Sequence, residues 1–431
     1  MGVALPRREP RHRRGAAHLG DVAGAAAERV ARASYGKLVA FLAARTGDVA
    51  GAEDALSEAF AAALTGWPAS GIPRAPEAWL LTVARRKMID AARRRRTGEE
   101  AAGVLQLISE ELEADTSIPD ERLRLMFACA HPAIDEAVRA PLILQTILGL
   151  DAATIASAFL VSPATMGQRL VRAKTRIKHA GVPFRVPARE ELAERLDAVL
   201  AAIYAAFAEG WSDPAGTEAR RRNLAEEGIW LGRLVASLLP GEPEALGLLA
   251  LMLHAEARRE ARRDAAGEYV PLAAQDPARW NPALIDEAEA LLHGASARGA
   301  IGRYQLEAAV QSAHAARRLS GRTDWAAIEK LYDALHAVTG SPVVAINRAI
   351  AVAETRGPAA GLALLDALEL DAALAARLAD YQPYWAARAA LLARTGSAAA
   401  ASDAYQRAIG LESDPAVRRF LQQRSAQLGK P

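Results

Sequence analysis

The segment between Pro163 and Ala180 is rich in cationic side chains and contains no acid. The chain as a whole has 53 basic and 51 acidic residues, a formal charge of only +2, so this concentration is local. Its cations are Arg169, Arg172, Lys174, Arg176 and Lys178. Arg and Lys neutralise phosphates, whereas polar groups near a helix N-terminus can contact base edges. The segment therefore predicts binding of a helix to DNA.

Apolar spacing predicts that this segment is a helix with one buried face. Met166, Leu170, Ala173 and Ile177 follow one another at steps of four, three and four residues. The face beside them carries Thr165, Gln168, Arg169, Arg172 and Arg176. The alternative is a solvated basic helix that caps a bundle.

The residues before this helix predict a helix–turn–helix. Gly149 ends an apolar run, and Asp151 can cap a short helix over 151–160. Ser162 can then serve as the N-cap of the basic helix, with Pro163 at its first position. Two short helices joined by about three residues are typical of this DNA-binding motif.

A second basic helix is expected over 76–96, after a Pro/Gly loop at 67–76 that carries Arg74. Cations at its end would be favoured by the helix dipole alone, but this does not explain those in its middle. The candidate DNA-binding residues of the helix are Arg85, Arg86, Lys87, Arg93 and Arg94. An acidic stretch, 97–119, separates the two basic helices. One protein holding DNA at two separated places would explain this arrangement.

Composition predicts an all-α protein of several domains. Alanine is abundant and apolar residues recur at helical spacing, whereas no apolar run is long enough to span a membrane. Residues 1–187 hold 26 basic and 20 acidic residues, and the remainder is net acidic. A single cysteine, Cys129, suits a reducing cytoplasm and is expected in the core. The expected divisions are a disordered leader at 1–25, domains at 26–96 and 120–182, the linker 97–119, and a helical extension at 190–431.

The extension shows weak repetition. LYDAL (331–335), LLDAL (364–368) and AYQRAI (404–409) recur at 33 and 40 residues, a period typical of tetratricopeptide-like helix pairs. We expect such pairs over 300–425, with an irregular alanine-rich helical domain as the alternative. The Arg-rich segment 258–280 is expected to be an internal ion-pair cluster rather than a contact with a partner.

Several motifs together resemble a known family. They are AEDALSEAF (52–60), AWLLTVARRKMID (78–90), PDERLRLMFACAHPAI (119–134) and TMGQRLVRAKTRI (165–177). In this order they resemble a bacterial sigma factor of the extracytoplasmic-function class, which keeps two domains called region 2 and region 4. The segments YAAFAEGW (204–211), QDPARWN (275–281) and PVVAINRAIAVA (342–353) resemble the subgroup with a tetratricopeptide-like extension. The resemblance covers about residues 25–425.

The resemblance implies core RNA polymerase and promoter DNA as partners. Region 2 would bind the coiled-coil of the β′ subunit through Glu53, Asp54, Leu56, Glu58 and Phe60. The loop and helix at 68–96 would melt and read the −10 element, and the helix at 163–179 would read the −35 element, with the β flap as a further contact. The linker would thread through the polymerase, and the extension would be regulatory and would bind a regulatory protein. Arg86 stands where relatives commonly have Asn, so the resemblance does not give the fine specificity of −10 reading. In the docking helix, Ser57 stands where many relatives have Gln.

Other functions remain as alternatives. A one-component helix–turn–helix regulator with a helical sensor domain would use one basic helix, and a scaffold would use neither. Cys129 and His131 are two residues apart, but no further Cys or His completes a metal site. We find no phosphate-binding loop and no catalytic Ser/His/Asp arrangement, so we expect no enzyme, no cofactor and no metal.

Overall fold

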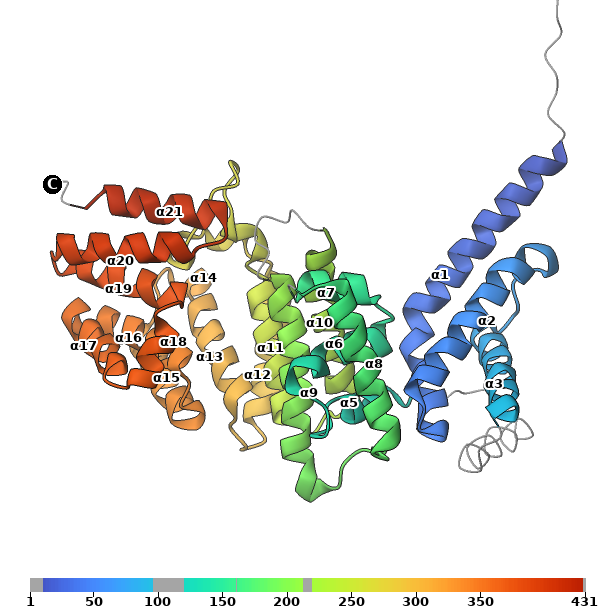
Figure 1. The fold of residues 1–431 in the computed structure, drawn as a ribbon. Coiled ribbons are helices and arrows are strands. Elements are labelled where there is room, and N and C mark those ends of the chain that lie inside the picture. Colours follow the sequence, from blue (N-terminus) through green and yellow to red (C-terminus); the bar gives the residue numbers. More distant parts are fainter. Residues whose placement is uncertain (1–10, 96–119, 160, 212–218, 429–431) are drawn as a thin grey trace, which may run out of the picture. The chain divides into compact units, whose positions relative to one another are not determined.

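Helices make up nearly all regular structure in the computed structural model, which describes residues 11–95, 120–159, 161–211 and 219–428 (Figure 1). The described residues contain no β-strand, although an isolated antiparallel bridge joins Arg263 and Tyr269. The all-α prediction is therefore confirmed. The chain divides into two units, Met1–Ala206 and Phe207–Pro431, with the dividing point inside one helix.

Unit 1 (Met1–Ala206) begins with three long helices that pack on one another. They are α1 (Arg11–Thr46), α2 (Val49–Ser70) and α3 (Pro76–Arg95). Their fully buried side chains include Leu38, Leu42, Leu56 and Leu80. The following helices are α5 (Arg122–Cys129), α6 (Glu136–Leu148), α7 (Ala152–Ala158), α8 (Pro163–His179) and α9 (Arg189–Trp211). Because α1 also packs on α5 and α6, the domains expected at 26–96 and 120–182 lie against each other within one unit.

Two expectations about unit 1 concern its N-terminal helices. Helix α1 begins at Arg11, within the leader expected at 1–25, and the disorder of the leader stays a prediction. The loop expected at 67–76 is shorter, because α2 continues through Pro68 to Ser70. Trp67 is buried there and lies edge-to-face with Trp79, at 5.5 Å between ring centroids. This burial offsets the helical hydrogen bond that proline cannot donate.

Residues 1–10 of the leader and the linker 97–119 lie outside the described residues, as does Leu160 between α7 and α8.

Unit 2 (Phe207–Pro431) is also a succession of helices. Its first helices are α10 (Ala219–Leu238), α11 (Pro243–Glu256), α12 (Pro282–Ser296), α13 (Arg303–Ala315) and α14 (Arg317–Ser320). The 3₁₀ turns η1 (Arg259–Arg262), η2 (Leu272–Ala274) and η3 (Pro277–Arg279) lie between α11 and α12. Helix α11 is buried along its whole middle, from Ala245 to Ala255, and packs on α10, α12 and α13. It is the centre of this part of the unit.

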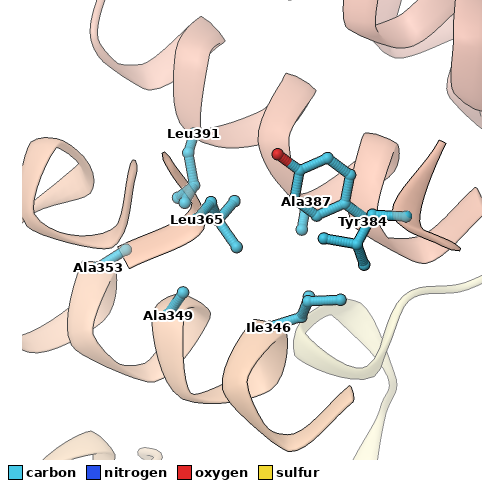
Figure 2. Packing of buried hydrophobic residues seen from close by; sticks show 8 residues of the cluster. Ile346, Ala349, Ala353, Leu365, Tyr384, Ala387 and Leu391 are labelled. Atoms are coloured by element: carbon cyan, nitrogen blue, oxygen red, sulfur yellow. The ribbon is translucent and has the colours of Figure 1, made fainter. Parts of the chain in front are cut away.

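The rest of unit 2 consists of helices that pack mainly on their neighbours in sequence. They are α15 (Trp325–Thr339), α16 (Pro342–Arg356), α17 (Pro358–Glu369), α18 (Ala372–Leu378), α19 (Gln382–Arg394), α20 (Ala398–Leu411) and α21 (Pro415–Ala426). Figure 2 shows one shared core, in which Ile346 and Ala349 of α16 face Leu365 of α17 and Tyr384 of α19. Neighbour-to-neighbour packing is what a repeat array requires, but the tetratricopeptide-like class stays a prediction.

Candidate nucleic-acid interface

Helix α8 has the local structure that its sequence predicted. The Ser162 hydroxyl accepts a hydrogen bond from the backbone N–H of Thr165 at 3.1 Å, and Pro163 occupies the first helical turn. The apolar face is confirmed, because its four side chains are at most 7% exposed. They are Met166, Leu170, Ala173 and Ile177. The cap and the buried face together fix which side of α8 meets solvent.

The preceding helix, α7, also begins at a side-chain cap. Gly149 ends α6 in the left-handed conformation, with φ of 70°. The Asp151 carboxylate then accepts hydrogen bonds from the backbone N–H groups of Ala153 and Thr154, at 2.9 and 2.8 Å. Helix α7 packs on α8. The two-helix layout is therefore present, and its use as a DNA-binding helix–turn–helix stays a prediction.

The solvent side of α8 presents a cationic row. Arg169, Arg172 and Arg176 are exposed, and Thr165 and Gln168 are exposed beside them toward the helix N-terminus. None of the three arginines forms an ion pair with another described residue. Three guanidinium groups with no acidic partner in the described part of the chain make a positive surface that can bind phosphates. The order along α8, hydrogen-bonding groups first and cations after, is suited to reading bases from the first turns.

The two lysines of α8 point elsewhere. Lys174 Nζ lies 2.6 Å from Glu53 Oε2, and Lys178 Nζ lies 2.8 Å from Asp48 Oδ2. The Lys174 and Glu53 side chains are only 11% and 10% exposed. Burial raises the pKa of Glu53, although the Lys174 ammonium opposes this effect. Lys174, a candidate DNA-binding residue, and Glu53, a candidate polymerase-binding residue, therefore bind each other in this structure.

The second cationic surface lies on α3 and the loop before it. Arg74, Arg86 and Lys87 are exposed, whereas the Arg85 guanidinium lies 5.0 Å from the centroid of the Phe41 ring. Lys87 Nζ forms an exposed ion pair with Glu58 Oε2 at 2.8 Å. The side chains of Arg93 and Arg94, in the last turn of α3, are outside the described part of the structure.

The candidate polymerase-binding residues of α2 divide into two groups. Asp54 and Glu58 are exposed and Phe60 is half-buried, so these side chains can contact a partner. Leu56 is fully buried and Glu53 is 8% exposed, so both face the interior of unit 1. The role of α2 in binding polymerase stays a prediction, and only its exposed or half-buried candidate residues can contact polymerase in this structure.

The acidic residues that bind the two lysines of α8 could not be identified from the sequence. Asp48 was not singled out, yet it caps α2 by accepting the N–H of Gly51 and also binds Lys178. Lys174 and Lys178 are four residues apart, so helical spacing predicts that their side chains lie on the same side of α8. The acids that they contact are more than 120 residues away in sequence, and no local pattern indicates such a pairing.

The Arg-rich segment 258–280 was expected to be an ion-pair cluster, which is only partly correct. Arg263 and Arg259 do bind acids, Asp414 and Glu256. Buried Arg258 instead donates to the carbonyl of His254 and to the side chain of Gln311. Arg262 donates to the carbonyl of Trp211 and lies over its ring, at 3.9 Å from the centroid. These arginines hold segments of unit 2 together.

Other kinds of site find no support in the described residues. They contain no group of His, Cys, Asp and Glu placed to hold a metal ion, and no helix among them is both apolar and long enough to cross a membrane. Cys129 is fully buried, as expected, and its thiol contacts the Thr146 hydroxyl at 3.5 Å. A cavity of about 340 Å³ lies between α6 and α9, and its lining combines alanines with Arg139, Arg195, Glu136, Glu194 and Asp197.

Comparisons with known proteins bear on both units. Residues 30–97, which include α2 and α3, match Sigma-70 region 2. Residues 195–296 match a family of unknown function, DUF6596. An uncharacterized protein of Rhizobium meliloti (strain 1021) is 39% identical over 379 residues, covering 86% of this chain and 88% of that protein. No solved structure matches. The region 2 match supports an RNA polymerase sigma factor, a transcription factor rather than an enzyme.

Proposed function

We propose that this chain, which belongs to the same family as the uncharacterized Rhizobium meliloti protein, is a sigma factor that brings core RNA polymerase to specific promoters. The observation that carries the proposal is the pairing of a Sigma-70 region 2 match with the exposed arginines of α8. Region 2 alone would bind polymerase and one part of a promoter. A second cationic helix gives the chain a separate contact with the same DNA.

In this proposal α3 and the loop before it act at the −10 element. Melting a duplex requires that bases be held out of the stack and that single-stranded phosphates be neutralised. Arg74 in the loop and Arg86 on α3 are exposed and can contact phosphates, and Arg85, Lys87, Arg93 and Arg94 belong to the same helix. Trp67 of α2 and Trp79 of α3, which precede and follow the loop in sequence, pack edge-to-face and hold its two ends together.

Helix α8 would read the −35 element. Thr165 and Gln168 lie where base edges come within reach, and Arg169, Arg172 and Arg176 would neutralise phosphates beside them. Contact with about three to five phosphates predicts that affinity for the promoter falls with salt at a log–log slope of roughly −3 to −5.

Helix α2 would dock on the β′ coiled-coil through Asp54 and Glu58, and the part of unit 1 that carries α8 would contact the β flap. Unit 2 would be regulatory and would receive a protein partner, and the whole would act in the cytoplasm. Support for a separate role of unit 2 is that it forms a compact unit of its own, whereas the Sigma-70 region 2 match and helix α8 lie in unit 1.

Run-off transcription tests the proposal. Purified chain and core polymerase are combined with promoters recovered by genome-wide binding of the chain. A sigma factor yields a transcript from a defined start that neither component gives alone. A one-component regulator binds the same DNA but yields no promoter-specific transcript with core polymerase, and that result would reject the proposal.

A further inference from the structure

The cavity of about 340 Å³ between α6 and α9 is lined entirely by residues of unit 1. Much of its wall consists of small side chains, because α6 contributes Ala140 and α9 contributes alanines at helical spacing. The alanines of α9 are Ala198, Ala201, Ala202 and Ala205. Since these positions carry no bulky side chain, the two helices leave a space of the size that small molecules occupy in proteins.

Two arginines line this cavity, and a backbone carbonyl holds each of them. Arg139 Nε of α6 donates to the carbonyl of Ile134 at 3.1 Å, and Arg195 Nη2 of α9 donates to that of Phe127 at 2.9 Å. Neither arginine forms an ion pair with a described residue, and Arg195 Nε is buried with no hydrogen-bond partner among them. The two guanidinium groups are therefore fixed in position and keep N–H groups that can donate to an anion.

The charge of Arg195 is held against its surroundings. Burial lowers the pKa of Arg195, and the cations of Arg185 and Arg139 act in the same direction, whereas two glutamates of α9 oppose them. An arginine side chain stays protonated in spite of such effects. A carboxylate bound beside Arg195 would compensate this partly desolvated charge.

Three acids line the same cavity without neutralising the arginines. They are Glu136 of α6 and Glu194 and Asp197 of α9, and all three are exposed. None of them forms an ion pair with another residue of the described ranges. Three acids against two arginines give the lining a net formal charge of −1. A purely anionic ligand would be repelled by the acids and a purely cationic one by the arginines, so a zwitterion complements the lining best.

We propose that this cavity binds a free α-amino acid, with its carboxylate on Arg139 and Arg195 and its ammonium group on the acids. Because the lining has one acid more than it has arginines, a basic amino acid such as lysine matches its charge. The site goes beyond the proposed function and does not depend on it, because the ligand binds the chain without polymerase or DNA. A bound amino acid joins α6 to α9, the helix that continues into unit 2.

Isothermal titration calorimetry of the full chain with L-lysine tests the proposal. Two comparison ligands carry charge of one sign only: putrescine has no carboxylate, and glutarate has no ammonium group. Both are expected to bind more weakly than lysine. Lysine that shows no binding at millimolar concentrations would overturn the proposal, and so would putrescine or glutarate that binds as tightly as lysine.

Arg139→Gln and Arg195→Gln each remove one guanidinium group. Each is expected to weaken lysine binding by roughly ten- to hundredfold, the usual effect of losing hydrogen bonds to a charged group. Arg45→Gln is the matched control and should bind lysine normally. Arg45 is also half-buried in unit 1 and donates to a backbone carbonyl, that of Phe41 at 3.0 Å, but it does not line the cavity. Unchanged lysine binding in both cavity variants would place the ligand elsewhere and overturn the proposal.

The acids provide a second answer if an arginine variant does not fold, which circular dichroism detects. Glu194→Gln and Asp197→Asn change exposed side chains that form no ion pair with a described residue, so the double variant is expected to fold. It should bind lysine more weakly and glutarate more tightly than the unaltered chain does. Lysine should also slow hydrogen exchange in α6 and α9 of the unaltered chain. A double variant that binds lysine with unchanged affinity would overturn the proposal.

Discussion

The ring of Tyr35 packs against Gly149, where α6 ends in the left-handed conformation. A Cβ atom on residue 149 would lie 3.0 Å from Cδ1 of Tyr35, and φ at this position is 70°. Tyr35 is on α1 and Gly149 immediately precedes the helix pair that ends in α8. Gly149 therefore turns the chain toward α7 and α8. It also leaves room for the Tyr35 ring, which belongs to the region 2 part of unit 1.

Gly149→Ala is expected to destabilise unit 1 by about 1–2 kcal/mol from the left-handed backbone alone, and by more because Tyr35 must move. Gly47→Ala is the matched control, since Gly47 has φ of 65° and nothing within 4 Å of its Cβ position. Urea unfolding of each variant measures its loss of stability, and hydrogen exchange in α1 and α6 locates that loss. Equal losses in the two variants would show that the Tyr35 contact contributes nothing.

The two lysine–glutamate pairs of α2 predict unequal effects. Lys174→Met leaves the Glu53 carboxyl buried without its cation. Breaking a buried pair in this way costs about 3–5 kcal/mol. Lys87→Met removes a pair whose side chains are 46% and 58% exposed, so the expected loss is about 0–1 kcal/mol. Chemical denaturation of the full chain compares the variants. A loss for Lys87→Met as large as that for Lys174→Met would contradict the burial argument.

Buried His254 and half-buried His314 predict that unit 2 loses stability in mild acid. Burial lowers the pKa of His254 and of His314 to about 4, with Arg258 adding to the effect at both. Below pH 6.5 the unfolded chain takes up these protons before the folded chain does, so the free energy of unfolding falls between pH 6.5 and 4. Each histidine contributes up to roughly 3 kcal/mol of this loss.

Hydrogen exchange in α11, measured across this pH range, reports the loss directly. His254→Leu should reduce the pH dependence and leave the part that His314 contributes. It breaks no hydrogen bond to a described residue, because neither ring nitrogen of His254 makes one. His293→Gln, at an exposed position of α12, is the control. A His254→Leu chain with unchanged pH dependence would exclude this histidine as a source of the effect.

The single thiol should be unreactive in the folded chain. Cys129 is fully buried, and burial raises its pKa to about 12, so almost no thiolate is present or accessible near pH 8. Iodoacetamide should label the chain in urea but not in buffer, as followed by mass spectrometry. Labelling at similar rates in both conditions would place Cys129 at the surface.

Local features were predictable from sequence because they depend on neighbouring residues. The cap at Ser162, the proline at 163 and the buried stripe of α8 all follow from helical spacing and hydrogen-bonding capacity. The course of α2 through Pro68 was not predictable from local preference, because the burial of Trp67 against Trp79 overrides it. The packing of Trp67, rather than the low helix propensity of proline, therefore determines that α2 continues through Pro68.

The long-range part of the candidate site could not be predicted. The spacing of Lys174 and Lys178 shows that they share a direction, but it does not identify Glu53 and Asp48 as their partners. The division between the two units, which falls within α9, could not be predicted either. Both depend on contacts between segments far apart in sequence, which no single-segment pattern records.

The central claim is tested most directly by run-off transcription with core polymerase and a chain whose cationic row on α8 has been removed. Arg169→Ala, Arg172→Ala and Arg176→Ala together should abolish the promoter-specific transcript and retain binding to polymerase. The matched control removes three exposed cations of unit 2, by Arg322→Ala, Lys330→Ala and Arg424→Ala, and should transcribe normally. A full transcript from the α8 variant, or no transcript from the unaltered chain, would contradict the account.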